Sequence, residues 1–301
     1  MRIEVNDKSF EIIKLLGKGK GGYSYLVTDG DKEYIVKKIH HEPCSYYQFG
    51  NKLQCEIEAY KRLKSIGISL PEMYDVDVER ELILKEYIDG NTIFDMEKDT
   101  VDVTEYIIQV NEMCKKLYEA NTNIDYFPTN FIPQKGQLYY IDYECNDYME
   151  EWNFENWGIK YWQQTKELIG YINKEIVRKF FIEGYVNHDY DKVMSIVADN
   201  YIDHSPAGAK SNKDAIGILK IVENMFKDLK VEIMDIFEEG NMVASRIKYS
   251  GIHSGECMGI AATGKPITFE ALENFKIKEG KIIESWGYWP DAEIKKILES
   301  K

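Results

Sequence analysis

Two acidic residues and one amide, Asp125, Asn130 and Asp142, lie close together near the middle of the chain. Asp125 and Asn130 flank Pro128, and an aromatic and aliphatic strand over 138–141 leads directly to Asp142. Phosphoryl transfer from ATP needs a carboxylate that accepts the proton of the acceptor, and an amide and a second carboxylate that hold Mg²⁺ on the phosphates. The residue types and spacing fit this chemistry, with Asp125 as the catalytic carboxylate and Asn130 and Asp142 as metal ligands.

This stretch resembles the catalytic loop and the metal-binding aspartate of the protein-kinase-like superfamily. The wording I-D-Y-E at 141–144 is more similar to choline and aminoglycoside kinases than to Ser/Thr kinases. The resemblance implies ATP and Mg²⁺ as cofactors, a nucleotide partner, and transfer of the γ-phosphate to a hydroxyl group of an unidentified small molecule or protein.

The elements that must position this site precede it in the chain. A glycine-rich run, G-K-G-K-G-G at 17–22, has β-rich sequence on both sides. Glycines let backbone amides approach phosphates, so we expect Gly17, Gly19 and Gly22 to form a hairpin flap over the nucleotide. In the following strand, Lys37 fits the kinase lysine that contacts the α- and β-phosphates.

An acidic helix is predicted over 50–63, because apolar residues recur there at helical spacing. Glu56 stands at the position of the kinase-type partner of Lys37, and Glu58 is a rival for that role. A Lys–Glu ion pair would fix the ammonium group over the phosphates.

The strand predicted over 81–90 corresponds to the hinge of the family, where backbone groups of Glu86 to Ile88 would bind adenine. An amphipathic helix predicted over 103–117 then leads to the catalytic loop. The flap, lysine, acidic helix, hinge, long helix and D-x4-N motif follow one another in the kinase order. We therefore predict a bilobal kinase-like domain with a reduced C-lobe over 1–165.

Two departures from the family pattern leave the activity open. Asn123 and Ile124 replace the His-Arg pair of protein kinases, and Phe127 replaces the lysine that steadies the transferred phosphoryl group. Few residues follow Asp142 before the next domain, so a large helical platform for peptides is missing. The tryptophan-rich segment 152–162 is expected to form the remaining helix, with its tryptophans in the core. A nucleotide-sensing pseudokinase is the alternative.

The second half, 166–301, predicts helices followed by an antiparallel sheet, because the apolar period changes from helical spacing to two. The resulting α+β cone resembles the SnoaL-like polyketide cyclases of the NTF2-like superfamily. The wording that carries this resemblance includes D-N-Y-I-D-H-S-P, G-I-H-S-G-E and G-K-I-I-E-S-W. A third reading therefore makes this half a cyclase, isomerase or ligand-binding module, with a regulatory kinase-like half.

The family's general acid/base aspartate follows the tryptophan of the last strand. Here this implies Asp291 after Trp286, although Pro290 displaces it by one position. His204, His253 and Trp286 are the expected ligand-binding residues of the cone. Two further carboxylates, Glu256 and Glu270, are alternatives to the aspartate, and structural roles for both histidines stay open.

Composition narrows the class of protein. A net charge of −14 and an isoelectric point near 5.0 argue against a nucleic-acid partner, which needs a basic face. The five cysteines are scattered without C-x-x-C spacing, and no apolar run is long enough for a membrane span. We expect a cytoplasmic protein without membrane contact, and the cone resemblance implies a homodimer as an open expectation.

Overall fold

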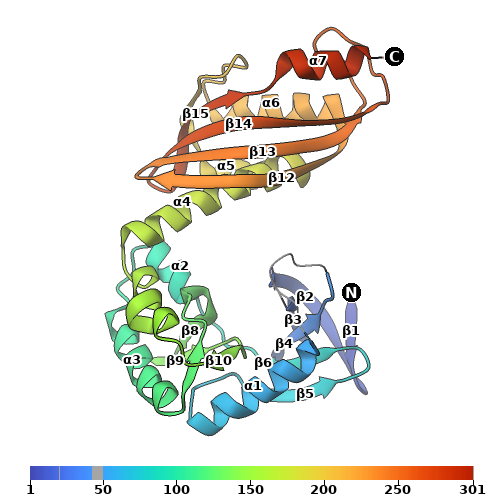
Figure 1. Ribbon diagram of the computed structural model, residues 1–301. Coiled ribbons are helices and arrows are strands. Elements are labelled where there is room, and N and C mark those ends of the chain that lie inside the picture. Colours follow the sequence, from blue (N-terminus) through green and yellow to red (C-terminus); the bar gives the residue numbers. More distant parts are fainter. Residues whose placement is uncertain (20, 43–49, 301) are drawn as a thin grey trace. The chain divides into compact units, whose positions relative to one another are not determined.

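The computed structural model describes residues 1–19, 21–42 and 50–300. The chain folds as two compact units, residues 1–165 (unit 1) and 166–301 (unit 2), whose elements are coloured along the chain in Figure 1. Within the described ranges, none of the helices combines the length and apolar character that crossing a membrane requires.

Unit 1 begins with a six-stranded antiparallel sheet in the order β1-β2-β3-β4-β6-β5. One helix, α1, follows β4 in the chain. Because β4 lies between β3 and β6, its residues occupy the middle of the sheet, where neighbours on both sides fix their direction. The bounds are Arg2–Val5 (β1), Lys8–Lys18 (β2), Gly22–Thr28 (β3), Glu33–Ile39 (β4), Lys52–Ile66 (α1), Met73–Asp77 (β5) and Leu82–Glu86 (β6).

The remainder of unit 1 packs helices against two small hairpin-like sheets. Its longest helix, α3, buries an apolar face that includes Val110, Met113 and Leu117, as the amphipathic pattern predicts. Strand β8 pairs with β9, and β7 pairs with β10. The bounds are Ile93–Lys98 (α2), Thr104–Glu119 (α3), Thr122–Ile124 (β7), Pro128–Asn130 (η1), Phe131–Gln134 (β8), Gln137–Tyr140 (β9) and Cys145–Asp147 (β10).

The tryptophan-rich segment forms three short turns instead of the expected helix: Glu150–Trp152 (η2), Phe154–Gly158 (η3) and Ile159–Tyr161 (η4). Asn153 separates the first two, because its side chain accepts a hydrogen bond from the Asn156 N–H at 2.7 Å. Trp162 is fully buried and donates its indole N–H to the Tyr126 carbonyl at 2.7 Å. Trp152 is exposed, so the expectation that the tryptophans form core is wrong for this residue.

Unit 2 is a curved five-stranded sheet covered by helices, in the strand order β11-β15-β14-β13-β12. All neighbours are antiparallel except β11 and β15. Figure 1 shows α4, α5 and α6 against this sheet. The bounds are Lys166–Phe181 (α4), Ile182–Val186 (η5), Tyr190–Ile196 (α5), Val197–Asp203 (β11), Asn212–Met225 (α6), Phe226–Glu239 (β12), Met242–His253 (β13), Pro266–Lys278 (β14), Lys281–Tyr288 (β15) and Asp291–Glu299 (α7).

Strand β14 shows the alternation that builds the core of unit 2. Every second side chain points inward, since successive residues of a strand face opposite sides of the sheet. The buried residues are Ile267, Phe269, Ala271, Glu273, Phe275 and Ile277. A carboxylate thus takes one position in an otherwise apolar row.

Unit 1 contains a buried charge of its own, Lys85 in β6. Its ammonium group donates a hydrogen bond to the Ile141 carbonyl at 2.6 Å and lies 4.7 Å from the centre of the Tyr143 ring. Burial, together with the nearby positive charge of Lys37, lowers the pKa of Lys85 to about 8. The contact joins the central sheet to the segment that precedes Asp142.

We predict that replacing this lysine changes how stability depends on pH. The pKa of Lys85 lies near 8 in the folded protein against an ordinary value of 10.5, so the unfolded chain binds more protons between these values. The contribution of Lys85 to stability therefore rises with pH in this window, by at most about 1.4 kcal/mol per pH unit. The Lys85→Met variant lacks this rise, which urea unfolding of both proteins at a series of pH values measures.

Lys38→Met is the matched control, because Lys38 is an exposed lysine of the neighbouring strand β4. Its difference from wild type should stay constant over the same window. A constant difference for Lys85→Met as well would contradict the lowered pKa. Lys37 does not affect this comparison. Its pKa is raised in the folded protein, so its contribution to stability is lost only at pH values above the ordinary lysine pKa of 10.5.

Candidate functional site

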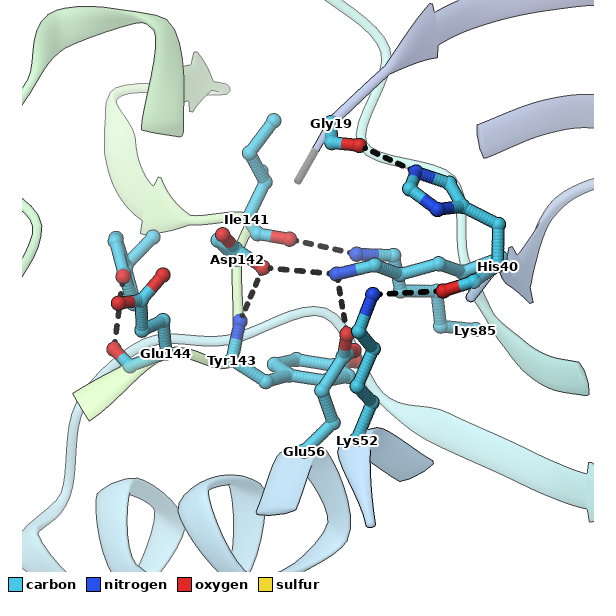
Figure 2. A network of polar contacts seen from close by, with 11 residues as sticks. Gly19, His40, Lys52, Glu56, Lys85, Ile141, Asp142, Tyr143 and Glu144 are labelled. Carbon is cyan, nitrogen blue, oxygen red and sulfur yellow. Dashed lines mark hydrogen bonds and ion pairs between the residues drawn. The ribbon is translucent and has the colours of Figure 1, made fainter. Parts of the chain in front are cut away.

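The sheet and helix α1 bring the predicted lysine and its acidic partner together. The Lys37 Nζ atom lies 2.6 Å from Glu56 Oε1 and 3.2 Å from Asp142 Oδ1, and Figure 2 shows the two carboxylates in this polar network. The Lys37 and Glu56 side chains are each only 13% exposed. The rival Glu58 is exposed and instead accepts a hydrogen bond from Gln54.

The electrostatics of this cluster favour its ionised state. Burial works against the ammonium form of Lys37, but the Asp142 and Glu56 carboxylates outweigh it and raise the Lys37 pKa. Burial likewise opposes ionisation of Asp142, yet the charges of Lys37 and Lys85 hold its pKa below the ordinary value. Lys37 is therefore a fixed positive charge, and Asp142 a fixed negative one, at neutral pH.

The glycine-rich run lies directly over this ion pair. A side chain at Gly21 would begin 3.3 Å from Glu56 Oε1, so the Glu56 carboxylate would have to move by a few tenths of an ångström to admit it. At Gly22 a side chain would collide with the Lys38 carbonyl at 2.5 Å. The Gly19 carbonyl contacts His40 Nε2 at 3.0 Å, and Gly17 lies in β2 with open space around it.

The predicted flap thus joins the paired strands β2 and β3, and its Gly21 lies next to the buried charges. Lys20, which belongs to the run, lies outside the described residues. Sequence reasoning chose Gly22 but not Gly21, which makes the closest approach to the Lys–Glu pair.

Hydrogen bonds to backbone carbonyls hold together the residues of the predicted catalytic loop. The Asn130 carbonyl accepts the Ile141 N–H at 2.8 Å, which sets Asn130 beside the residue that precedes Asp142. The Asn130 amide donates to the Asp125 carbonyl at 3.2 Å. Buried Tyr140 has a pKa well above its ordinary value because of burial first and then the charges of Asp142 and Asp125. The three predicted residues therefore gather around one end of the β8–β9 hairpin.

Two oxygens of this group fit a hard cation. Asp142 uses Oδ1 for Lys37 and for the Tyr143 N–H, while its Oδ2 accepts no hydrogen bond from the described residues. The side-chain oxygen of Asn130 has no hydrogen-bond partner there either. Magnesium binds through one or two protein oxygens and completes its shell with phosphates and water, so Asn130 and Asp142 are residue types that could supply its protein ligands.

The predicted hinge residues differ in what their backbones offer. The Glu86 N–H donates to the Glu72 carbonyl at 2.8 Å, and its carboxylate accepts the Glu72 N–H, so Glu86 is occupied within the sheet. Ile88 is buried, and within the described part of the chain its backbone N–H has no partner. Of these two residues, Ile88 therefore keeps the donor that the hinge expectation requires.

Unit 2 contains a cavity of about 570 Å³ between the sheet and its helices. The carboxyl group of Glu273, only 6% exposed as a residue, lies in its wall. Glu273 Oε1 accepts the Tyr249 hydroxyl at 2.8 Å and the Trp289 indole N–H at 3.2 Å. Burial raises the pKa of Glu273, and the neighbouring Asp203 adds to this, against the lowering effect of the two hydrogen bonds.

The residues expected to line the cone lie elsewhere, with one exception. Trp286 stacks on His204 with ring centres 4.7 Å apart, and His204 contacts Glu284 at 2.9 Å; none of the three lines the cavity. Strand alternation explains the position of Trp286. The side chain of the preceding residue, Ser285, faces the cavity, so that of Trp286 points to the opposite face of the sheet. His253 is fully buried in a contact with the Thr263 hydroxyl at 2.9 Å and is also absent from the cavity wall.

Asp291 is the exception, since it lines the cavity from the first residue of α7 and is exposed. Of the alternatives, Glu270 points outward and pairs with Arg246 at 2.9 Å, and Glu256 is exposed. Sequence reasoning missed Glu273, although the period of two over 267–277 marks it as an inward position. It missed Lys85 too, because a lysine in a short apolar strand resembles an edge residue.

Comparisons with known proteins concern mainly the second unit. Residues 175–296 match the family model described as SnoaL-like polyketide cyclase. The chain is also similar to solved structures at low identity. A SnoaL-like polyketide cyclase-type protein from Jannaschia sp. CCS1 shares 18% identity, with 46% of this chain and 99% of that chain covered and a TM-score of 0.43. IdmH from Streptomyces antibioticus shares 22% identity, with 42% of this chain and 99% of that chain covered and a TM-score of 0.39.

One curated protein matches the N-terminal part. KEOPS complex subunit Bud32 from Pyrococcus abyssi (strain GE5 / Orsay) is 29% identical over 91 residues, or 29% of this chain. The chain thus spans 41% of the length of this relative. Among these comparisons, the family match carries a conclusion about fold: unit 2 contains a SnoaL-like domain of mixed α+β structure.

Proposed function

We propose that unit 1 binds ATP with Mg²⁺ and transfers the γ-phosphoryl group to a hydroxyl group of a small molecule. The observation that carries this proposal is the double ion pair of Lys37 with Glu56 and Asp142. A lysine fixed in this way beside a second carboxylate and under a glycine hairpin matches what phosphoryl transfer requires of its nucleotide site. The similarity to Bud32 is a weaker additional support for a kinase-like unit 1.

Each residue then has a role that follows from its position. Lys37 contacts the α- and β-phosphates, and the hairpin that includes Gly19 and Gly21 covers them with backbone amides. Ile88 offers its backbone N–H to the adenine ring. Asn130 and Asp142 hold Mg²⁺, which when bound neutralises charge on the phosphate oxygens.

The transfer step needs one base. The acceptor oxygen bonds to the γ-phosphorus while the bond from that phosphorus to the bridging oxygen of ADP breaks, and the acceptor proton passes to the Asp125 carboxylate. Asp125 is half-buried, and its Oδ1 accepts the Phe127 N–H at 3.0 Å, which orients the carboxyl group. ADP and the phosphorylated acceptor leave.

A small acceptor suits the architecture better than a peptide. After Asp142, the described part of unit 1 contains only the short strand β10 and the turns η2, η3 and η4. These elements offer no long helices on which a peptide could dock. We therefore place a small hydroxyl compound at the acceptor site.

Phe127 favours a second candidate, a nucleotide sensor that binds ATP without transfer. It replaces the loop lysine of the family pattern, and its ring packs among Phe94, Trp157 and Tyr161 at centre distances of 5.1 to 6.4 Å. An aromatic ring supplies no charge to the moving phosphoryl group. The two candidates share the binding site and differ in turnover.

We predict that ATP stabilises the protein only partly without metal and more strongly with Mg²⁺. A ligand at 100 times its Kd stabilises by about 2.7 kcal/mol, which corresponds to a shift of several degrees in Tm. Asp142→Asn should lose the Mg²⁺-dependent part of this shift, measured against the Tm of the same variant without ligand. Asp147→Asn, a change at an exposed carboxylate of nearby β10, should keep it. Equal shifts in both variants would rule out Asp142 as a metal ligand.

We predict that turnover depends on Asp125. Loss of a general base reduces the rate by about 10²- to 10⁴-fold, so Asp125→Asn should release ADP correspondingly more slowly in the presence of a panel of small hydroxyl compounds. Its Mg²⁺–ATP shift in Tm should survive. A wild-type protein that binds Mg²⁺–ATP but transfers phosphate to no acceptor supports the sensor, whereas unaltered turnover in Asp142→Asn excludes the proposed transferase site.

A further inference from the structure

The cavity of unit 2 has a one-sided charge. Three carboxyl groups, those of Asp203, Glu273 and Asp291, belong to its wall. Among the described residues that line it there is no lysine, arginine or histidine. A wall with carboxyl groups of one sign repels an anionic ligand and attracts a cationic one.

Only one of the two deeper carboxyl groups is left incompletely paired. Asp203 accepts the Ser205 N–H at 2.8 Å, the Ser205 hydroxyl at 2.6 Å and the Ser285 hydroxyl at 3.1 Å. Glu273 accepts both of its hydrogen bonds on Oε1, and its Oε2 receives none from the described residues. Oε2 lies beside Gly287, another residue of the cavity wall, where a side chain would begin 3.8 Å away. This oxygen is not among the fully buried side-chain atoms without a partner.

Aromatic and aliphatic side chains form the rest of the wall. Their rings can hold a cation by its charge as well as pack against an apolar body, and the volume suits a drug-sized molecule. The aromatic residues are Phe180, Tyr185, Tyr201, Phe275, Tyr288 and Trp289.

We propose that this cavity binds a largely apolar amine in its protonated form, and that Glu273 Oε2 accepts the hydrogen bond of the ammonium group. The walls enclose the apolar part, and Asp203 and Asp291 add long-range attraction. The inference rests on unit 2 alone and does not depend on the nucleotide proposal.

Binding of such a ligand is coupled to the ionisation of Glu273. Burial raises the pKa of Glu273, whereas a bound ammonium group favours the carboxylate, so the cation binds better to the deprotonated form. The groups that face Glu273 are Tyr249 on β13, Tyr185 on η5, Tyr201 and Asp203 on β11, and Trp289. The three tyrosines have raised pKa values and stay neutral, so they do not compete with Glu273 for a proton.

Three fluorescent probes with one body and different charge test the proposal on the full chain. They are N-dansyl-1,5-diaminopentane (cationic), N-dansylpentylamine (neutral) and N-dansyl-6-aminohexanoate (anionic). We expect the cation to bind about tenfold more tightly than either of the others, since a hydrogen bond between charged groups contributes roughly that factor or more. Its affinity should also rise with pH as Glu273 loses its proton.

Glu273→Gln removes the charge and keeps an oxygen for Tyr249 and Trp289. This variant should lose the preference for the cation and the associated rise with pH. Glu270→Gln, an outward-facing change three residues earlier on β14, should keep both. If Glu273→Gln does not fold, the probe series and the pH dependence of the wild type decide alone.

Equal binding of the three probes, tighter binding of the neutral or anionic probe, or no binding of any of them overturns the proposal. A preference for the cation that survives in a folded Glu273→Gln variant overturns the role of this residue.

Discussion

The ammonium group of Lys37 has to stay charged where most water is excluded, and the arrangement of unit 1 follows from that requirement. Burial alone would favour the neutral amine, and the carboxylates of Glu56 and Asp142 reverse this preference. The two carboxylates come from α1 and from the segment after β9, so the ion pairs join the sheet to a helix and to a hairpin. Removing one partner of a buried pair leaves an unpaired charge, at a cost of about 3–5 kcal/mol.

A second lysine makes the charge of this region adjustable. With Lys37 and Lys85 protonated and Glu56 and Asp142 ionised, the four groups sum to zero. Lys85 has a pKa of about 8, so its proton is the one most readily lost near neutral pH. Phosphates that enter the site would bring negative charge and favour the protonated form of Lys85. Loss of the Lys85 proton would in turn leave the site more negative and favour binding of an additional cation. The contact of Lys85 with the Ile141 carbonyl puts this proton next to the segment that carries Asp142.

The sequence allowed the parts of unit 1 to be predicted where pattern and order agree. Lys37 and Glu56 could be proposed because the resemblance to the kinase order implied their positions, whereas Glu58 stayed a rival until the structure showed its exposed contact with Gln54. The hinge was predicted less well, because the Glu86 N–H is taken by Glu72, a partner from β-sheet pairing that no local pattern reveals. The segment 152–162 failed as a helix for a local reason, since Asn153 caps a new turn within it.

In unit 2 the error had a different origin. His204 and Trp286 were chosen by residue type, whereas the alternation of β15 sends Trp286 to the face away from the cavity. The same rule places Glu273 on the inward face, between Ala271 and Phe275. Strand alternation could therefore have predicted this residue, whereas a choice by residue type did not. The charge assembly of the cavity, with Asp203 from β11 opposite Glu273 from β14, depends on long-range strand order and was not available locally.

The two units differ in the partners that they provide for their buried carboxyl groups. In unit 1 each carboxylate meets an ammonium group from the protein itself, so the cluster is balanced within the chain. In unit 2 the donors that Glu273 meets among the described residues are neutral, Tyr249 and Trp289. They leave one oxygen without a partner from that part of the chain and supply the carboxyl group with no positive charge. An apolar residue at that position would remove the cost of burying a carboxyl group. A carboxyl group that is neither balanced nor replaced is best explained by a charge that arrives from outside, and the one-sided wall of the cavity fixes the sign of that charge as positive.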